Sequence, residues 1–124
     1  MNALGRHVLA EIYGCNPEVL DNPETVERIL LQAAVEAGAD VRQVAFHKFS
    51  PQGVSGVVVI SESHLAIHTW PEYGYAAVDV FTCGDRVNPW EVCNRIVTGF
   101  DAKQVQATEM RRGVFGVSPK QVAG

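Results

Sequence analysis

The segment Val57-Val-Val-Ile-Ser-Glu-Ser-His-Leu-Ala-Ile-His-Thr-Trp70 predicts two strands joined by a tight turn. The β-branched run at 57–60 is typical of a strand that is buried on both faces. Residues 64–70 predict the second strand, and its pairing should stop at Pro71 because proline has no amide hydrogen to donate. The hairpin also concentrates hydroxyl, carboxyl and imidazole groups, which ordinary core strands do not.

The segments on either side predict further strands and two helices. Asp21-Asn-Pro-Glu24 and Asn88-Pro89 each predict a helix start, because a capping side chain precedes a proline in the first turn. Gly38 fits the position just past the first helix. We expect the tail from Gly113 to be loosely held. Apolar alternation predicts four more strands, at residues 5–13, 41–49, 75–81 and 103–110.

These elements, six strands and two helices, predict an α+β fold. We expect a two-layer α/β sandwich, a mainly antiparallel sheet with two helices on one face. The other face of the sheet must also be covered, and its many apolar residues favour a second copy of the chain, which gives a homodimer. A length of 124 residues predicts a single domain, 1–124.

The charge, the apolar segments and the cysteines indicate what the protein binds and in which cellular compartment it works. The net charge is −4 and the basic residues form no long run, which argues against nucleic acid as the main partner. We see no signal peptide, and no apolar segment approaches the roughly 20 residues of a membrane helix. The three cysteines are an odd number without CxxC spacing, which favours free thiols in a reducing cytoplasm.

The pair Glu62-Ser63 suggests a serine that attacks its own backbone. Attack of the Ser63 hydroxyl on the Glu62 carbonyl carbon converts the amide to an ester, which requires a strained peptide and a stabilised oxyanion. A base then removes the Ser63 α-proton, Glu62 leaves as a carboxylate, and loss of ammonia to water leaves a pyruvoyl group at position 63. His64 or His68 would be the base, and Ser55 would supply a hydrogen bond.

Other interpretations of these residues stay open at this point. Ser63, His64 and His68 would be ordinary strand and turn residues if the cluster arose by chance. A serine hydrolase usually has a GxSxG elbow, and the Gly-Val-Ser-Gly of residues 53–56 is not that motif. A zinc site from His64, His68 and Cys83 is disfavoured, since His-x3-His on a strand separates the two rings widely, and we expect no metal.

The run from Gly53 to Glu72, together with Phe81-Thr-Cys-Gly84, resembles the prokaryotic S-adenosylmethionine decarboxylase proenzymes. Leu4-Gly-Arg-His7 and Val19-Leu-Asp-Asn22 match the same family. The resemblance implies a self-processing enzyme with a covalent pyruvoyl cofactor. Such an enzyme decarboxylates S-adenosylmethionine, which supplies the aminopropyl donor for spermidine.

The resemblance also implies where the chain is cut. Ser63 matches the self-cleaving serine, so the break falls after Glu62. The products would be a β chain of residues 1–62 and an α chain of residues 63–124. His68 matches the histidine that is needed for processing, where it removes the Ser63 α-proton.

Further matching residues are implied to act on the ester or the substrate. Ser55 matches the serine that supports the ester intermediate, and Cys83 matches the acid that protonates the α-carbon after carbon dioxide leaves. Phe49 and Glu72 resemble residues that stack on adenine and bind the ribose hydroxyls. Trp70 is a further candidate to stack on adenine and to meet the sulfonium by cation–π attraction.

The longer eukaryotic enzyme looks like two fused copies of this fold, which implies that each site crosses a dimer interface. Ser63 and Cys83 would come from one protomer, and the partner would supply Phe49, Ser55, His68 and Glu72. Two alternatives stay open. One is a relative that decarboxylates a basic amino acid such as arginine, and the other is a binding or regulatory dimer in which Ser63 is never cleaved.

Overall fold

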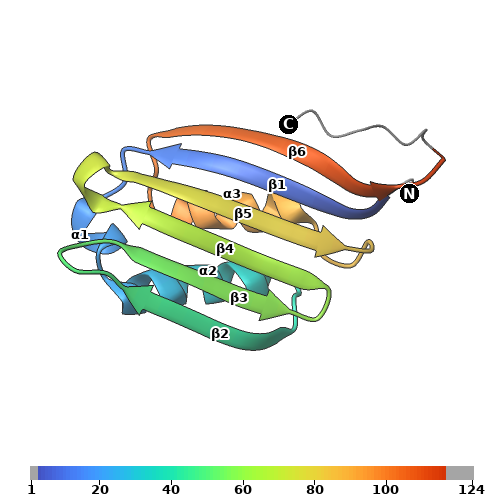
Figure 1. Ribbon diagram of the computed structural model, residues 1–124, viewed down its shortest axis with the longest axis horizontal. Coiled ribbons are helices and arrows are strands. Elements are labelled where there is room, and N and C mark those ends of the chain that lie inside the picture. Colours follow the sequence, from blue (N-terminus) through green and yellow to red (C-terminus); the bar gives the residue numbers. More distant parts are fainter. Residues whose placement is uncertain (1–2, 117–124) are drawn as a thin grey trace, which may run out of the picture.

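The computed structural model describes residues 3–116 of the chain. Within these residues, six antiparallel strands form one sheet in the order β2-β3-β4-β5-β1-β6 (Figure 1). The elements in chain order are β1 (Ala3–Tyr13), α1 (Pro17–Leu20), α2 (Pro23–Glu36), β2 (Val41–Lys48), β3 (Val54–Ile60), β4 (Ser63–Trp70), the 3-10 helix η1 (Pro71–Tyr73), β5 (Tyr75–Cys83), α3 (Pro89–Gly99) and β6 (Gln104–Val114).

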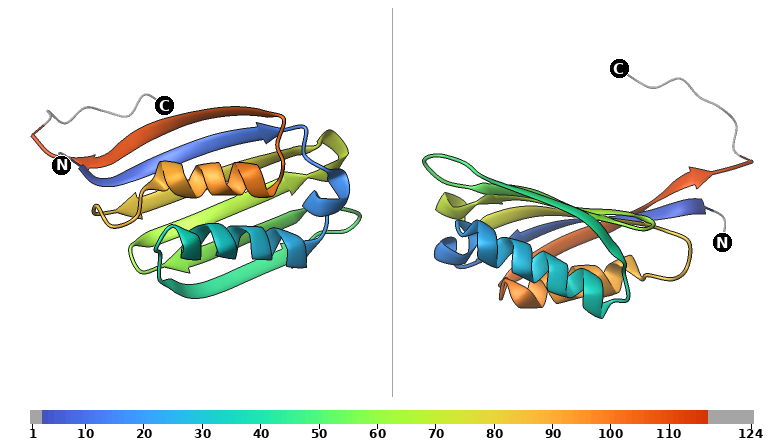
Figure 2. Two further views of the ribbon diagram at one scale, coloured as in Figure 1. Left: turned by 180° about the vertical axis from the view of Figure 1, so that it is seen from behind. Right: turned by 90° about the horizontal axis from the view of Figure 1, so that it is seen from below.

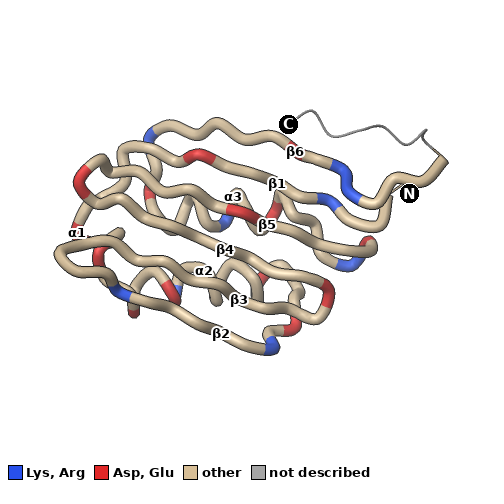
Figure 3. The backbone as a smooth tube through the Cα atoms, in the orientation of Figure 1, with Lys and Arg blue, Asp and Glu red and all other residues tan. Residues whose placement is uncertain are grey.

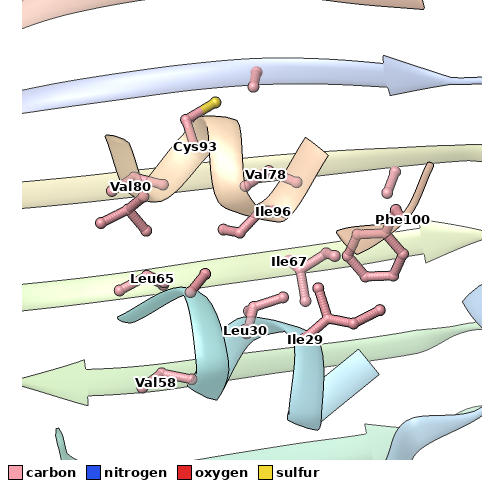
Figure 4. Packing of buried hydrophobic residues seen from close by; sticks show 14 of the residues in the cluster. Ile29, Leu30, Val58, Leu65, Ile67, Val78, Val80, Cys93, Ile96 and Phe100 are labelled. Atoms are coloured by element: carbon pink, nitrogen blue, oxygen red, sulfur yellow. The ribbon is translucent and has the colours of Figure 1, made fainter. Parts of the chain in front are cut away.

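The molecule has two layers, as the sequence predicted. Helices α2 and α3 pack side by side on one face of the sheet, and no helix of the described segment lies on the other face (Figure 2). The core lies between the two layers, where the apolar residues of the central strands meet those of the helices (Figure 4). No helix in the described part of the chain is long and apolar enough to cross a bilayer.

Both long helices begin where their capping signals predicted. The Asn22 side chain accepts a hydrogen bond from the Glu24 amide, at 3.0 Å, and Pro23 lies in the first turn. The Asn88 side chain accepts from the Trp90 amide, at 2.9 Å. These bonds satisfy amides that have no partner within the helix.

Within a single chain, the run at 57–60 is not buried on both faces as predicted. In β3 the side chains of Val58 and Ile60 are 0% and 4% exposed, whereas Val57 and Val59 are only partly buried. The reason is that helices cover only one face of this sheet, so that burial alternates along each central strand.

Two other features differ from the prediction, a short helix and the end of the last strand. Helix α1 is a single turn, capped by the Asn16 side chain, and it is too short to give a helical periodicity in the sequence. Strand β6 continues past its predicted end and through Gly113, because it pairs with β1 along most of its length. Residues 117–124 of the predicted loose tail lie outside the described residues.

The open face of the sheet has few charges near its centre. Strands β3 and β4 contain no Lys, Arg, Asp or Glu, and both are tan in Figure 3. Leu9 of β1 is 40% exposed, and Val57 and Val59 of β3 are partly exposed. The second copy that we expect to cover this face stays a prediction.

The edge strand β6 is fixed by one carboxylate. Glu109 accepts two hydrogen bonds from the Arg6 guanidinium, at 2.9 and 3.0 Å, and one from the Trp90 indole, at 2.6 Å. These bonds, first those from Arg6 and then that from Trp90, lower the pKa of Glu109 from 4.5 to about 2. The carboxylate therefore links β6 to β1 and to the first turn of α3.

Replacing Glu109 by Gln should lower the free energy of unfolding at pH 7 by about 1–3 kcal/mol, because the charged acceptor of three hydrogen bonds is lost. The folded-state pKa lies below the unfolded one. The stabilisation is therefore complete above about pH 4.5 and is lost as the pH falls toward 2. Urea unfolding at several pH values checks this, with the exposed Glu91→Gln as the matched control. A difference that stays constant with pH would contradict the assignment.

Candidate active site

Ser63 lies at the first position of β4, directly after a turn that contains no glycine. Its φ of 149° makes it one of two non-glycine residues with positive φ in the described chain. A tight hairpin commonly contains such a residue, and glycine supplies it without steric cost. Here a serine adopts this conformation, so the backbone at the Glu62–Ser63 peptide bond is strained.

The carbonyl that precedes Ser63 is held by the neighbouring strand. The Cys83 amide donates a hydrogen bond of 2.9 Å to the Glu62 carbonyl oxygen. A Cβ at the next residue, Gly84, would approach a carboxylate oxygen of Glu62 to 3.1 Å, and Gly84 itself has a φ of +75°. The structure thus brings together Glu62, Ser63 and Cys83, and a backbone donor is directed at the carbonyl that Ser63 would attack.

One histidine lies beside this serine. The Ser63 hydroxyl oxygen is 3.4 Å from Nδ1 of His64, and the His64 ring meets the edge of the Phe81 ring at a centroid distance of 5.8 Å. Of the two histidines proposed as bases, His64 is therefore the one that can reach Ser63 within a single chain.

A second cluster lies at the other end of β4. Ser55 and His68 are directly opposite each other in the β3–β4 ladder, and Ser55 Oγ lies 2.7 Å from His68 Nδ1. They line a cavity of about 310 Å³, within the size range of small-molecule sites. The cavity is also lined by three candidate substrate-binding residues, Phe49, Trp70 and Glu72.

The Asp21 carboxylate holds the loop that contains Phe49 in place. The Asp21 carboxylate accepts a hydrogen bond of 2.8 Å from the Gly53 amide and lies 3.1 Å from the Lys48 ammonium. These two groups, the Gly53 amide first, lower the pKa of Asp21. The Phe49 amide also donates to the Gly53 carbonyl at 2.8 Å, which closes the loop at the edge of the cavity.

The two clusters cannot meet within one chain. Ser63 and His68 are five residues apart on the same extended strand, and at about 3.4 Å per residue this separates them by about 17 Å. The structure therefore brings the predicted site residues together in two groups. One is Glu62, Ser63 and Cys83, and the other is Phe49, Ser55, His68, Trp70 and Glu72.

The cysteines differ in accessibility. Cys15 and Cys93 are buried at 4% and 2% exposure, and burial raises the pKa of both thiols, that of Cys15 to about 11. Cys83 is partly exposed. Cys83 is therefore the only one of the three thiols that is not buried.

Sequence reasoning missed one residue of this region, Thr82, which is buried at 1% exposure. Nearby in β5, the Asp79 carboxylate lies 3.4 Å from His7 Nε2. In the part of the chain that the structure describes, no three His, Cys, Asp or Glu side chains form a group that could hold a metal ion.

The fold and these two groups define a class of protein: a two-layer α+β chain with a divided site, in which a strained serine lies at one end and a histidine-lined cavity at the other. The sequence profile of the S-adenosylmethionine decarboxylase family matches residues 6–113. The chain therefore belongs to the S-adenosylmethionine decarboxylase family, a family of enzymes, as its motifs had indicated.

Individual relatives agree with this assignment. The chain is 70% identical to the S-adenosylmethionine decarboxylase proenzyme of Acetivibrio thermocellus over 115 residues. This aligned region covers 93% of this chain and 93% of the relative. It is 67% identical over 123 residues to that of Moorella thermoacetica, covering 99% of this chain and 97% of the relative. Its structure is similar to the crystal structure of the adenosylmethionine decarboxylase from Aquifex aeolicus, with a TM-score of 0.87 and 34% identity over 98% of this chain and 100% of that chain.

Proposed function

We propose that this chain is the proenzyme of a cytoplasmic, pyruvoyl-dependent decarboxylase that acts on S-adenosylmethionine. It cuts itself between Glu62 and Ser63 into residues 1–62 and 63–124. One observation carries the proposal: a serine with strained backbone follows a carbonyl that already accepts the 2.9 Å hydrogen bond from the Cys83 amide. The family assignment supports the same activity.

The first stage changes the backbone at Ser63. The bond from Cys83 polarises the Glu62 carbonyl, and release of backbone strain offsets part of the cost of exchanging an amide for an ester. His64 Nδ1 takes the hydroxyl proton as the Ser63 oxygen attacks, and that proton goes to the amine as the carbon–nitrogen bond breaks. His68, supported by Ser55, then removes the Ser63 α-proton, and Glu62 leaves as a carboxylate.

The remaining residue takes up water and releases ammonia, which leaves the pyruvoyl group at position 63. The strained backbone of Ser63 and the hydrogen-bonded carbonyl of Glu62 both fit a pyruvoyl group that is made from the chain itself at this position. When present, the group supplies an electron-withdrawing carbonyl that accepts the electrons left as carbon dioxide departs.

The chain's other residues hold the substrate and move one proton. Phe49 and Trp70 offer aromatic faces to the adenine and to the sulfonium, an attraction of roughly 0.5–2 kcal/mol. Glu72 accepts hydrogen bonds from the ribose hydroxyls. Cys83 donates its thiol proton to the carbon that carried the carboxylate.

The working site is shared by two copies of the chain. His68 lies about 17 Å from Ser63 of its own chain, so it reaches a serine only in another copy. Packing of the open sheet faces against each other would bring the partner's cavity over Ser63 and Cys83. This arrangement also covers the apolar strand residues that the helices leave exposed.

Other functions account for fewer of these observations. Decarboxylation of arginine would use the same serine, but it leaves unexplained the pairing of aromatic side chains with Glu72 in one cavity. A binding or regulatory dimer gives no reason for the strained backbone at Ser63. An assay of carbon dioxide release from S-adenosylmethionine, arginine and ornithine compares the three functions directly.

Replacing Ser63 by Ala should leave a single uncut chain and abolish carbon dioxide release, because no hydroxyl is left to form the ester. Denaturing electrophoresis and the release assay check this. Ser61→Ala is the matched control, since the Ser61 hydroxyl bonds to Arg42 and not to the cleaved peptide, and it should be cut normally. Fragments from Ser63→Ala would exclude the mechanism.

Replacing Cys83 by Ala should still allow cleavage, because the bond to Glu62 comes from the backbone amide and not from the thiol. Turnover of the cut enzyme should fall by about 100-fold, the size of a general-acid contribution. Steady-state kinetics per cut chain measure this, with the buried Cys93→Ala as the control. Wild-type turnover in Cys83→Ala would remove the thiol from the proton-transfer step.

Mixing Ser63→Ala and His68→Ala chains should restore cleavage, although neither is cut alone. Each mixed dimer contains one intact site, made of Ser63 from the His68→Ala chain and His68 from the Ser63→Ala chain. Only the chain with the His68→Ala substitution should be cut, which mass spectrometry with one isotope-labelled chain resolves. A confirmed mixed dimer without cleavage would show that the site is not shared in this way.

A further inference from the structure

The core contains a hydroxyl with no hydrogen-bond partner. The two buried polar side chains of the described residues are Thr69 and Thr82, at 6% and 1% exposure. The Thr69 hydroxyl donates to the Leu20 carbonyl at 2.8 Å and accepts from the Val54 amide at 2.9 Å. The Thr82 hydroxyl has no partner within residues 3–116. Burying an unpaired hydroxyl lowers the stability of a fold.

Packing does not require a hydroxyl at this position. The residues of β5 that face the helices are Ala76, Val78, Val80 and Thr82, so threonine ends an otherwise apolar row. Valine has nearly the same shape as threonine, so it would fill the same space without an unpaired group. The hydroxyl therefore lowers stability where it is, and this points to a role outside folding.

The position of Thr82 points to cleavage. Thr82 is directly opposite Ser63 in the β4–β5 ladder and immediately precedes Cys83, whose amide holds the Glu62 carbonyl. Thr82 and Glu62 also line the same small cavity. The unpaired donor thus lies beside the one peptide of the chain that must pass through an oxyanion.

We infer that the Thr82 hydroxyl is a second oxyanion donor for self-cleavage, an inference that rests on the proposed function. As the Ser63 oxygen bonds to the Glu62 carbonyl carbon, the carbonyl oxygen gains a negative charge. The Thr82 hydroxyl donates a hydrogen bond to that oxygen beside the Cys83 amide and transfers no proton. When the tetrahedral centre collapses to the ester, the charge and this bond are lost again.

The absence of this bond in the uncut chain agrees with such a role. A donor that is paired equally well before and during the reaction does not accelerate it, whereas one that gains its partner only at the oxyanion does. Removal of a single oxyanion donor typically slows a reaction by about 100- to 1,000-fold. The stability cost of the unpaired hydroxyl is then a consequence of its function.

Cleavage kinetics of pulse-labelled full-length chain made by cell-free synthesis test the inference. Thr82→Val should be cut at least about 10-fold more slowly than wild type while its melting temperature stays equal or rises. If Thr82 were only structural, its replacement by Val would lower both the melting temperature and the cleavage rate. Thr82→Val cleaved at the wild-type rate would overturn the inference.

A second pair of variants keeps the test valid if valine disturbs the fold. Thr82→Ser and Thr82→Ala both lose the methyl group and differ only in the hydroxyl. The Thr82→Ser chain should be cut at close to the wild-type rate, and the Thr82→Ala chain should be cut at least about 10-fold more slowly. Equal rates for the pair would contradict the role of the hydroxyl.

The affected step can be identified with hydroxylamine, which cleaves esters. Uncut Thr82→Val should resist it because the ester is not formed, whereas His68→Ala should accumulate an ester that hydroxylamine cuts. Rapid hydroxylamine cleavage of uncut Thr82→Val would place the defect after the acyl shift and overturn the inference. Failure of wild type to cut itself would instead refute the proposed function.

Discussion

The hydrogen bond from the Cys83 amide to the Glu62 carbonyl is the constraint on which the rest of the site depends. It fixes one atom of the turn between β3 and β4 to the end of β5, and Ser63 follows with a φ of 149°. A tight turn that contains no glycine would ordinarily relax, but pairing of β4 with strands on both sides prevents this. Sheet formation therefore supplies both the strain and the backbone donor on which the proposed acyl shift relies.

The same extended geometry divides the catalytic groups. An antiparallel strand holds its residues at a fixed rise, so a serine at its start and a histidine five residues later cannot meet. In the arrangement that we propose, one copy of the chain supplies the cleavage end of a site and a second copy supplies its cavity end. The apolar open face and the divided site are thus two aspects of one arrangement. Thr82 adds a stability cost inside the core, at the cleavage end.

Local signals in the sequence were sufficient for most of the fold. Asn22-Pro23 and Asn88-Pro89 marked the helix starts because capping depends on neighbouring residues alone. Within a single chain, the burial of β3 differs from the prediction, since a β-branched run does not reveal how many faces a second layer covers. Motif residues such as Ser63, Cys83 and His68 could be proposed as site residues from the sequence, but their division into two groups depends on strand register. Thr82 could not be found at all, because an unpaired hydroxyl is a property of the packed core.

The mass of the α chain purified from wild-type protein tests the central claim most directly. A chain that begins with a pyruvoyl group at position 63 should be lighter by one ammonia than residues 63–124 with an amino-terminal serine. It should also gain two hydrogens on treatment with borohydride. An active protein that retains the intact chain, or whose fragment begins with an unmodified serine, would contradict the account.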